Sequence, residues 1–165
     1  MKQRRGNQNI QPKTTNLNQM KRITLIMLIL LAVSTLTTRA IPDNVEEIKT
    51  VIKKAYIEGI HNGGSLDETR LGFHPGFELL ILENNQLDKL PIEKWIEKIE
   101  QARKDPNTPQ IPKTSVKFIN IDCTGTAAVA KIELYREDKL IFTDYLSLYR
   151  FNEGWRIVSK IYCKH

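Results

Sequence analysis

The stretch DYLSLYRFNEGWRIVSKI, residues 144–161, holds two runs rich in aromatic and β-branched residues, separated by Asn152-Glu153-Gly154. Runs of this composition favour β-strands, and Asn and Gly are typical of the tight turns that join antiparallel strands. The stretch therefore predicts a hairpin of two long strands, at residues 140–151 and 155–163.

Two further strands are predicted just before this hairpin, at residues 115–123 and 127–135. Thr124-Gly125-Thr126 joins them to each other, and residues 136–139 lead into the hairpin. Because these connections are short and contain turn-forming residues, each neighbouring pair should be antiparallel. The C-terminal part of the chain therefore predicts a four-stranded meander.

Helical periodicity appears closer to the N-terminus. Asp43 or Asn44 is a suitable N-cap, and the apolar residues after it recur at intervals of three and four. This spacing predicts an amphipathic helix of about 16 residues, which Gly63-Gly64 should end. A capping box, Ser65-Leu66-Asp67-Glu68, predicts a second, short helix through Leu71.

A short strand and a third helix complete the expected set. Phe73-His74-Pro75-Gly76 predicts a turn, residues 77–83 a buried strand and Asn84-Asn85 another turn. Pro91 suits the first turn of a helix whose apolar face includes Trp95. Three helices followed by a meander predict an α+β fold, in which the N-terminal helices pack on a curved antiparallel sheet.

The charge of the chain is unevenly distributed. The 165 residues carry a formal net charge of +6, but residues 1–40 hold seven basic residues and no acidic one. That leaves 18 basic and 19 acidic residues in 41–165. A nearly neutral working domain argues against a nucleic-acid partner, which needs a basic surface.

Residues 1–40 resemble an export signal. Met20-Lys21-Arg22 is a short basic region, residues 23–36 are largely apolar, and Ala40 ends a segment that suits signal peptidase. We expect cleavage after Ala40, a single domain at 41–165 without a membrane anchor, and a periplasmic or secreted location. The apolar run is shorter than the roughly 20 residues of a spanning helix, which disfavours an anchor. Translation from Met20, a long signal peptide from Met1 and a cytoplasmic arm remain alternatives.

Two cysteines, Cys123 and Cys163, lie in separate predicted strands of the meander. A disulfide requires the two Cα atoms to lie within about 7 Å. The predicted registers keep the two strands too far apart for this, so we expect no bridge within the chain.

The predicted turns also assign side chains to the two faces of the sheet. They place Tyr145, Ser147 and Tyr149 on the face with Trp155 and Ser159, where the helices should pack. The opposite face would be half apolar, which predicts a homodimer packed sheet to sheet. The same registers place Asp144 near Lys131 and Lys160, as a structural ion pair or as a functional charge site.

Several of these segments together resemble the putative lumazine-binding family. They are Phe73-His74-Pro75, Ile92-Glu93-Lys94-Trp95 and the hairpin of residues 144–161, and the resemblance covers about residues 42–163. The family belongs to the nuclear transport factor 2-like superfamily, which also holds the SnoaL-like polyketide cyclases and the ketosteroid isomerases. The resemblance implies a cone-shaped, commonly dimeric α+β domain with a pocket between the helices and the concave sheet face. No flavin or other cofactor follows from the family's name alone.

Seven residues are candidates for the lining of such a pocket, because aromatic rings and small polar groups suit a planar ligand. They are Tyr56, His74, Trp95, Tyr145, Ser147, Tyr149 and Ser159. The alternatives are core packing for the aromatic residues, a loop-fixing role for His74 and hydrogen bonds to the backbone for the two serines. Trp155 is expected in the core.

The sequence contains no recognisable catalytic motif. Asp67 and Glu78 do not form an evident acid and base pair, and His61, His74 and His165 lack the spacing of a metal site. We therefore expect no metal, and an exported protein that binds an apolar or aromatic small molecule. An isomerase, cyclase or dehydratase using the same pocket is the alternative, and a protein-interaction role through the sheet is a third.

Overall fold

The computed structural model describes residues 43–165. All the helices and strands given below belong to one compact unit, Pro42–His165. The expectations for the leader, namely a start at Met20 and cleavage after Ala40, concern residues outside the described range. Within residues 43–165, no helix has the length and apolar character needed to cross a membrane.

The predicted helices are present. α2 (Asn44–Val51) is capped by Asp43, whose side chain accepts a hydrogen bond from the Val45 N–H, and it continues into the π-helix η1 (Ile52–His61). α3 (Leu66–Gly72) begins after Ser65, whose hydroxyl accepts from the Glu68 N–H as a capping box requires. α4 (Ile92–Lys104) follows Pro91 directly. The wider π-helical turns of η1 were not predicted.

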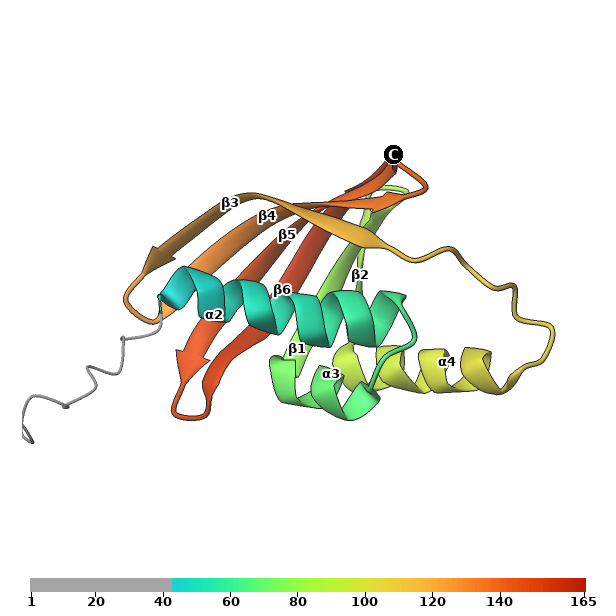
Figure 1. The fold of residues 1–165 in the computed structure, drawn as a ribbon, viewed down its shortest axis with the longest axis horizontal. Coiled ribbons are helices and arrows are strands. Elements are labelled where there is room, and N and C mark those ends of the chain that lie inside the picture. The colour runs from blue at the N-terminus through green and yellow to red at the C-terminus, as the bar shows by residue number, and fades with distance from the viewer. Residues whose placement is uncertain (1–42) are drawn as a thin grey trace, which may run out of the picture. The chain divides into compact units, whose positions relative to one another are not determined.

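Six strands form one sheet in the order β2-β1-β6-β5-β4-β3. The four strands of the predicted meander are confirmed as antiparallel neighbours, and β1 pairs with β6 in parallel, so the sheet is mixed. Their bounds are β1 (Phe73–Glu83), β2 (Gln86–Pro91), β3 (Ser115–Thr124), β4 (Ala127–Arg136), β5 (Lys139–Phe151) and β6 (Gly154–Lys164). Figure 1 shows α2 lying across the sheet and the other helices beside it.

Two features near β1 differ from the prediction. Residues 73–76 do not form a separate turn, because β1 begins at Phe73 and its pairing with β6 shifts register between Phe73 and Glu78. The strand β2 was not predicted because it is short and mostly exposed, so it lacks the alternation of apolar residues that marks a half-buried strand. Asn84 and Asn85, both at positive φ, form the predicted turn between β1 and β2.

The predicted faces of β5 and β6 are partly wrong. Tyr145, Ser147, Tyr149 and Ser159 lie on the outer face, away from the helices, whereas Leu146 and Leu148 lie on the concave face and are buried.

Three local features explain this difference. The β5–β6 turn contains two residues, since Phe151 pairs with Gly154. Ile141 in β5 and Val158 in β6 are extra residues at register shifts. A shift of one residue moves every following side chain to the other face, so each bulge reverses the expected alternation.

The core lies between the helices and the concave face of the sheet. Ile48, Ile52 and Tyr56 from the helices are fully buried against Ile132 and Leu146 of the sheet. Trp155 is 3% exposed, which confirms its predicted place in the core. Cys123 and Cys163 lie on β3 and β6, with β4 and β5 between them, and both are free.

Candidate functional site

The concave face carries a buried group of ionisable side chains. Asp144 on β5 is fully buried and Lys160 on β6 is 4% exposed. The Tyr56 hydroxyl, from η1, donates a hydrogen bond of 2.6 Å to Asp144 Oδ2, and Lys160 Nζ lies 3.1 Å from Asp144 Oδ1. We call these three residues, with the neighbouring His61 and Trp95, the Asp144 cluster.

The two bulges explain why opposite charges lie in the core. The extra residue Ile141 turns Asp144 towards the helices, and the extra residue Val158 does the same for Lys160. With unbroken alternation from Trp155, Lys160 would lie on the outer face. Burying charged groups costs free energy unless they are paired, and here both bulges are needed to bring the pair together.

Aromatic rings surround the Lys160 ammonium. Its Nζ lies 4.6 Å from the ring centre of Tyr162, 5.1 Å from Tyr56, 5.7 Å from Phe142 and 5.8 Å from Trp95. These distances are in the range of cation–π contacts. Within residues 43–165, Asp144 is the one acidic side chain at ion-pair distance, although an ammonium has three N–H donors.

His61 joins the cluster through the π-helix. Its ring lies edge-on to Tyr56, with ring centres 4.8 Å apart. The two residues are five positions apart, the spacing that π-helical hydrogen bonds bring together and an α-helix does not. His61 Nε2 is buried and has no hydrogen-bond partner among the described residues. Burial, with the charges of Lys160 and Arg136, lowers the pKa of His61 to about 3, so the ring is neutral near pH 7.

Burial shifts the acid and the base of the cluster towards their uncharged forms. It raises the pKa of Asp144, although Lys160 and the Tyr56 hydroxyl act in the opposite direction. It lowers the pKa of Lys160, against the influence of Asp144. The pKa of Tyr56 is raised well above its usual value by burial and by Asp144. A proton shared between Asp144 and Lys160 is therefore easier to move than in a pair exposed to water.

The cluster places polar groups beside aromatic rings, an arrangement that suits a ligand with one polar edge and one apolar face. Asp144 Oδ1 faces the Lys160 ammonium at 3.1 Å, and Asp144 Oδ2 accepts a hydrogen bond from the Tyr56 hydroxyl. The cluster thus combines the Asp144 carboxyl group, the Lys160 ammonium and the unpartnered ring nitrogen His61 Nε2 with the half-buried ring of Trp95. In the described part of the chain, no group of three or more His, Cys, Asp or Glu side chains could hold a metal ion.

The predicted pocket residues lie in three different places. Tyr56 and Trp95 are in the Asp144 cluster. His74 stacks on Phe151 with ring centres 4.8 Å apart, and its Nδ1 accepts a hydrogen bond from the Gly76 N–H, which is a loop-fixing arrangement.

The remaining four lie on the outer face. Tyr145 and Tyr149 are 39% and 52% exposed. Ser147 and Tyr149 line a hollow of about 310 Å³ there, and Ser159 pairs with Ser147 across the strands. The predicted ion pair of Asp144 with Lys160 is confirmed but lies on the concave face, while Lys131 lies on the outer face over the Tyr145 ring.

The sequence contains a weak signal for the buried pair of Asp144 and Lys160. A charged residue inside an otherwise apolar strand, as at Asp144 and Lys160, indicates either an outer face or a special buried site. Only the positions of the bulges decide between these, and neither bulge has a clear residue signature. The place of His61 in the cluster has no sequence signal, because its approach to Tyr56 depends on the π-helix.

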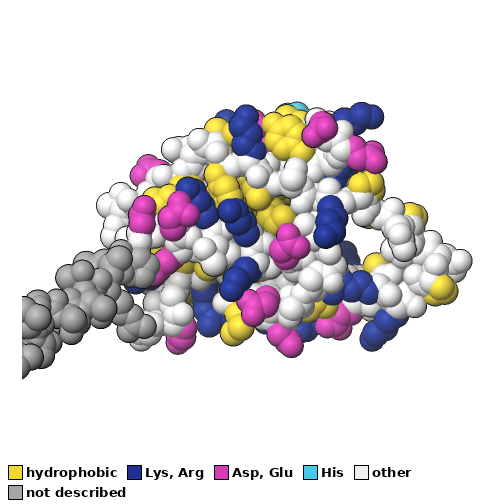
Figure 2. Space-filling model, viewed as in Figure 1, with side chains coloured by type: hydrophobic (Ala, Val, Ile, Leu, Met, Phe, Trp, Pro, Cys, Tyr) yellow, Lys and Arg dark blue, Asp and Glu magenta, His cyan; other side chains and the backbone are white. Residues whose placement is uncertain are grey.

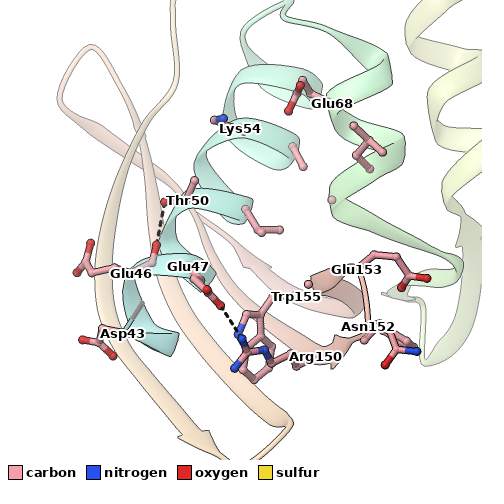
Figure 3. Close-up of a pocket in the computed structure, with 16 residues that line it drawn as sticks. Asp43, Glu46, Glu47, Thr50, Lys54, Glu68, Arg150, Asn152, Glu153 and Trp155 are labelled. Carbon is pink, nitrogen blue, oxygen red and sulfur yellow. Dashed lines mark hydrogen bonds and ion pairs between the residues drawn. The ribbon is translucent and has the colours of Figure 1, made fainter. Parts of the chain in front are cut away.

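A second concavity lies between α2, α3 and the β5–β6 turn. It has a volume of about 690 Å³, with Val51, Ala55 and Trp155 among its apolar lining. Figure 3 shows acidic side chains around it, together with Lys54 and Arg150. Glu47 Oε2 lies 3.7 Å from an Arg150 nitrogen. On the described part of the surface shown in Figure 2, basic and acidic side chains are intermixed and form no continuous basic stripe.

Comparisons with known proteins agree with this architecture. A family model described as putative lumazine-binding matches residues 43–163. A nuclear transport factor 2-like protein of unknown function from Shewanella baltica is 28% identical, with a TM-score of 0.59 over 73% of this chain and 93% of that one.

More distant structures share the fold. A nuclear transport factor 2-like protein from Cytophaga hutchinsonii is 12% identical (TM-score 0.59, 74% of this chain and 99% of that one). One of unknown function from Methylobacillus flagellatus is 20% identical (TM-score 0.55, 77% and 96%). No curated protein matches the chain. The family match and the shared fold together show that the chain belongs to the putative lumazine-binding family and has the cone-shaped α+β fold of nuclear transport factor 2-like proteins.

Proposed function

We propose that the domain binds a small molecule at the Asp144 cluster, on the concave face of its sheet. The observation that supports this most directly is that a buried ring nitrogen, His61 Nε2, has no hydrogen-bond partner among the described residues and belongs to the same cluster as the buried Asp144–Lys160 pair. An unpaired buried polar atom costs roughly 1–3 kcal/mol. A ligand that forms a hydrogen bond with His61 Nε2 recovers this free energy.

The surroundings of the cluster define the class of ligand. Trp95, Phe142 and Tyr162 are half-buried rings beside Lys160, so one side of the ligand meets flat apolar surface. The ligand is therefore aromatic or largely apolar, with one polar edge that faces Asp144, Lys160 and His61. Membership of the putative lumazine-binding family supports binding of this general kind.

Export and dimer formation belong to the same proposal. The export signal in residues 1–40 supports a periplasmic or secreted protein. Val129, Tyr145, Tyr149 and Ile161 from three adjacent strands of the outer face are between 39% and 52% exposed. Exposed apolar groups gathered on one face favour a partner surface, and a second copy packed sheet to sheet covers them.

A thermal-shift screen tests the binding proposal. The purified protein is mixed with riboflavin, a lumazine, a pterin and a steroid, and the melting temperature is measured. We expect at least one compound to stabilise the wild type, because a ligand of the native state raises its stability in proportion to ln(1 + [L]/Kd).

Matched variants locate the site of binding. The shift should disappear in Asp144→Asn and remain in Glu47→Gln, which alters the 690 Å³ concavity instead. Shifts lost in Glu47→Gln and kept in Asp144→Asn would contradict the proposal, as would the absence of any shift across a broad panel.

An isomerase-type enzyme is the second candidate, and one observation favours it. Tyr56 and a buried Asp144 with a raised pKa are 2.6 Å apart, and both can donate to a developing oxyanion when Asp144 is protonated. A tyrosine and a protonated aspartate serve in this way in ketosteroid isomerase. Exchange of a ligand's α-proton in heavy water that is lost in Tyr56→Phe would support the enzyme, and no exchange would support binding alone.

A further inference from the structure

We propose that Lys160 binds a carbonyl compound covalently, as a reversible imine formed on the concave face of the sheet. This inference rests on the proposed function, because it assigns the ligand of the Asp144 cluster to aldehydes and ketones. It requires an amine that is partly unprotonated, a neighbouring acid and a surface that holds the carbonyl compound in place.

The position of Lys160 meets the first two requirements, and the half-buried rings of Trp95, Phe142 and Tyr162 beside it meet the third. Its side chain is 5% exposed and Asp144 is fully buried, with 3.1 Å between Nζ and Oδ1. The four aromatic rings around Nζ do not accept a proton; their cation–π contacts favour the ammonium, whereas burial favours the free amine. A lysine in such low-polarity surroundings is a stronger nucleophile than a surface lysine at pH 7, because more of it is the free amine. The direction of the Lys160 pKa, lowered chiefly by burial, agrees with this geometry.

The other titratable groups around Lys160 do not prevent the reaction. Tyr56 and His61 face it from η1 and Tyr162 lies on its own strand. Tyr56 stays protonated because its pKa is raised, and His61 stays neutral because its pKa is about 3. Asp144 is therefore the group in the cluster that exchanges protons with the amine.

Each step of the reaction is balanced within the cluster. The nitrogen lone pair attacks the carbonyl carbon, the C=O π electrons move to oxygen, and the Asp144 carboxyl group gives its proton to that oxygen. Asp144 then removes a proton from the nitrogen and delivers it to the new hydroxyl group, which leaves as water. The product is a protonated imine beside the Asp144 carboxylate, and addition of water reverses every step.

Reductive trapping tests the inference in the wild-type protein. Benzaldehyde and sodium cyanoborohydride are added at pH 7, and peptide mass spectrometry measures the rate of benzylation at each lysine. We expect Lys160 to be benzylated faster than the exposed lysines, because its lowered pKa leaves more of the side chain as the free amine. Lys131, which lies over Tyr145 on the outer face, is the internal comparison.

Three variants separate the chemistry from folding. Lys160→Arg keeps the charge but cannot form an imine, and should lose the fast site while circular dichroism stays unchanged. Lys131→Arg should lose only its own slow label. Asp144→Asn should slow labelling of Lys160, because it cannot supply the proton.

The outcomes distinguish this inference from the proposed function. Fast labelling of Lys160 supports it. Labelling of surface lysines at equal or greater rates overturns it, and the proposed function still stands if a compound from the thermal-shift screen binds in an Asp144-dependent manner. If that binding is also absent, both proposals fail.

Discussion

Replacing Lys160 by methionine tests how the buried ion pair contributes to stability. Methionine fills similar space among the aromatic rings but removes the charge, so the fully buried Asp144 loses its counter-ion. Removing one partner of a buried pair costs about 3 to 5 kcal/mol of unfolding free energy. We expect a loss of this size for Lys160→Met near neutral pH.

The loss of stability in Lys160→Met should increase as the pH rises. The pKa of Asp144 is already raised in the native state and rises further without Lys160. As the pH rises above about 4, the unfolded chain releases this proton while the native state retains it, so stability falls with pH. The fall should be about 1.4 kcal/mol per pH unit until the native pKa is reached.

Urea unfolding at several pH values measures both effects. The double variant Asp144→Leu with Lys160→Met is the control, since an apolar replacement of both partners is often neutral or stabilising. It should recover most of the lost stability, less about 1 kcal/mol for the Tyr56 hydroxyl that loses its acceptor. A cost below about 1 kcal/mol for Lys160→Met, independent of pH, would show that the pair contributes no more than an exposed one.

Three further predictions concern other contacts. Because the native pKa of His61 is about 3, the unfolded state binds a proton that the native state does not as the pH falls below 6.5. As the pH falls below 6.5, the wild type should lose up to about 1.4 kcal/mol of unfolding free energy per pH unit, and His61→Phe should lose less. Identical pH profiles of the two proteins in urea titrations would contradict this. Tyr56→Phe leaves Asp144 Oδ2 without its donor and should cost about 1–3 kcal/mol in the same assay, whereas an unchanged midpoint would oppose it. Tyr145→Lys and Ile161→Lys on the outer face should each shift the sedimentation equilibrium from dimer to monomer; a monomeric wild type rules out the proposed interface.

The sequence predicted the order of the elements because the signals for each are local. Asp43 and Ser65 cap their helices as expected, and the hairpin turns join the predicted neighbours. These features depend on residues within one or two turns of each other. The partner of β1 could not be predicted, because its pairing with β6 joins segments about eighty residues apart along the chain.

The site was harder to predict because it depends on the exact register. One extra residue at Ile141 and another at Val158 decide which side chains face the helices. They bring Asp144 and Lys160 to the concave face and send Tyr145 and Ser159 outwards. Since a bulge has only a weak sequence signature, alternation alone assigned these residues to the wrong faces.

The most direct test of ligand binding at the Asp144 cluster uses the two tryptophans of the chain. Trp95 lies in the Asp144 cluster, and Trp155 lines the other concavity. Variants with Trp95→Phe or Trp155→Phe each retain a single fluorophore, and each is titrated with the compound that raises the melting temperature most. Binding at the cluster predicts that Trp95 emission changes along the binding curve and Trp155 emission does not. A change in emission confined to Trp155 would contradict binding at the Asp144 cluster.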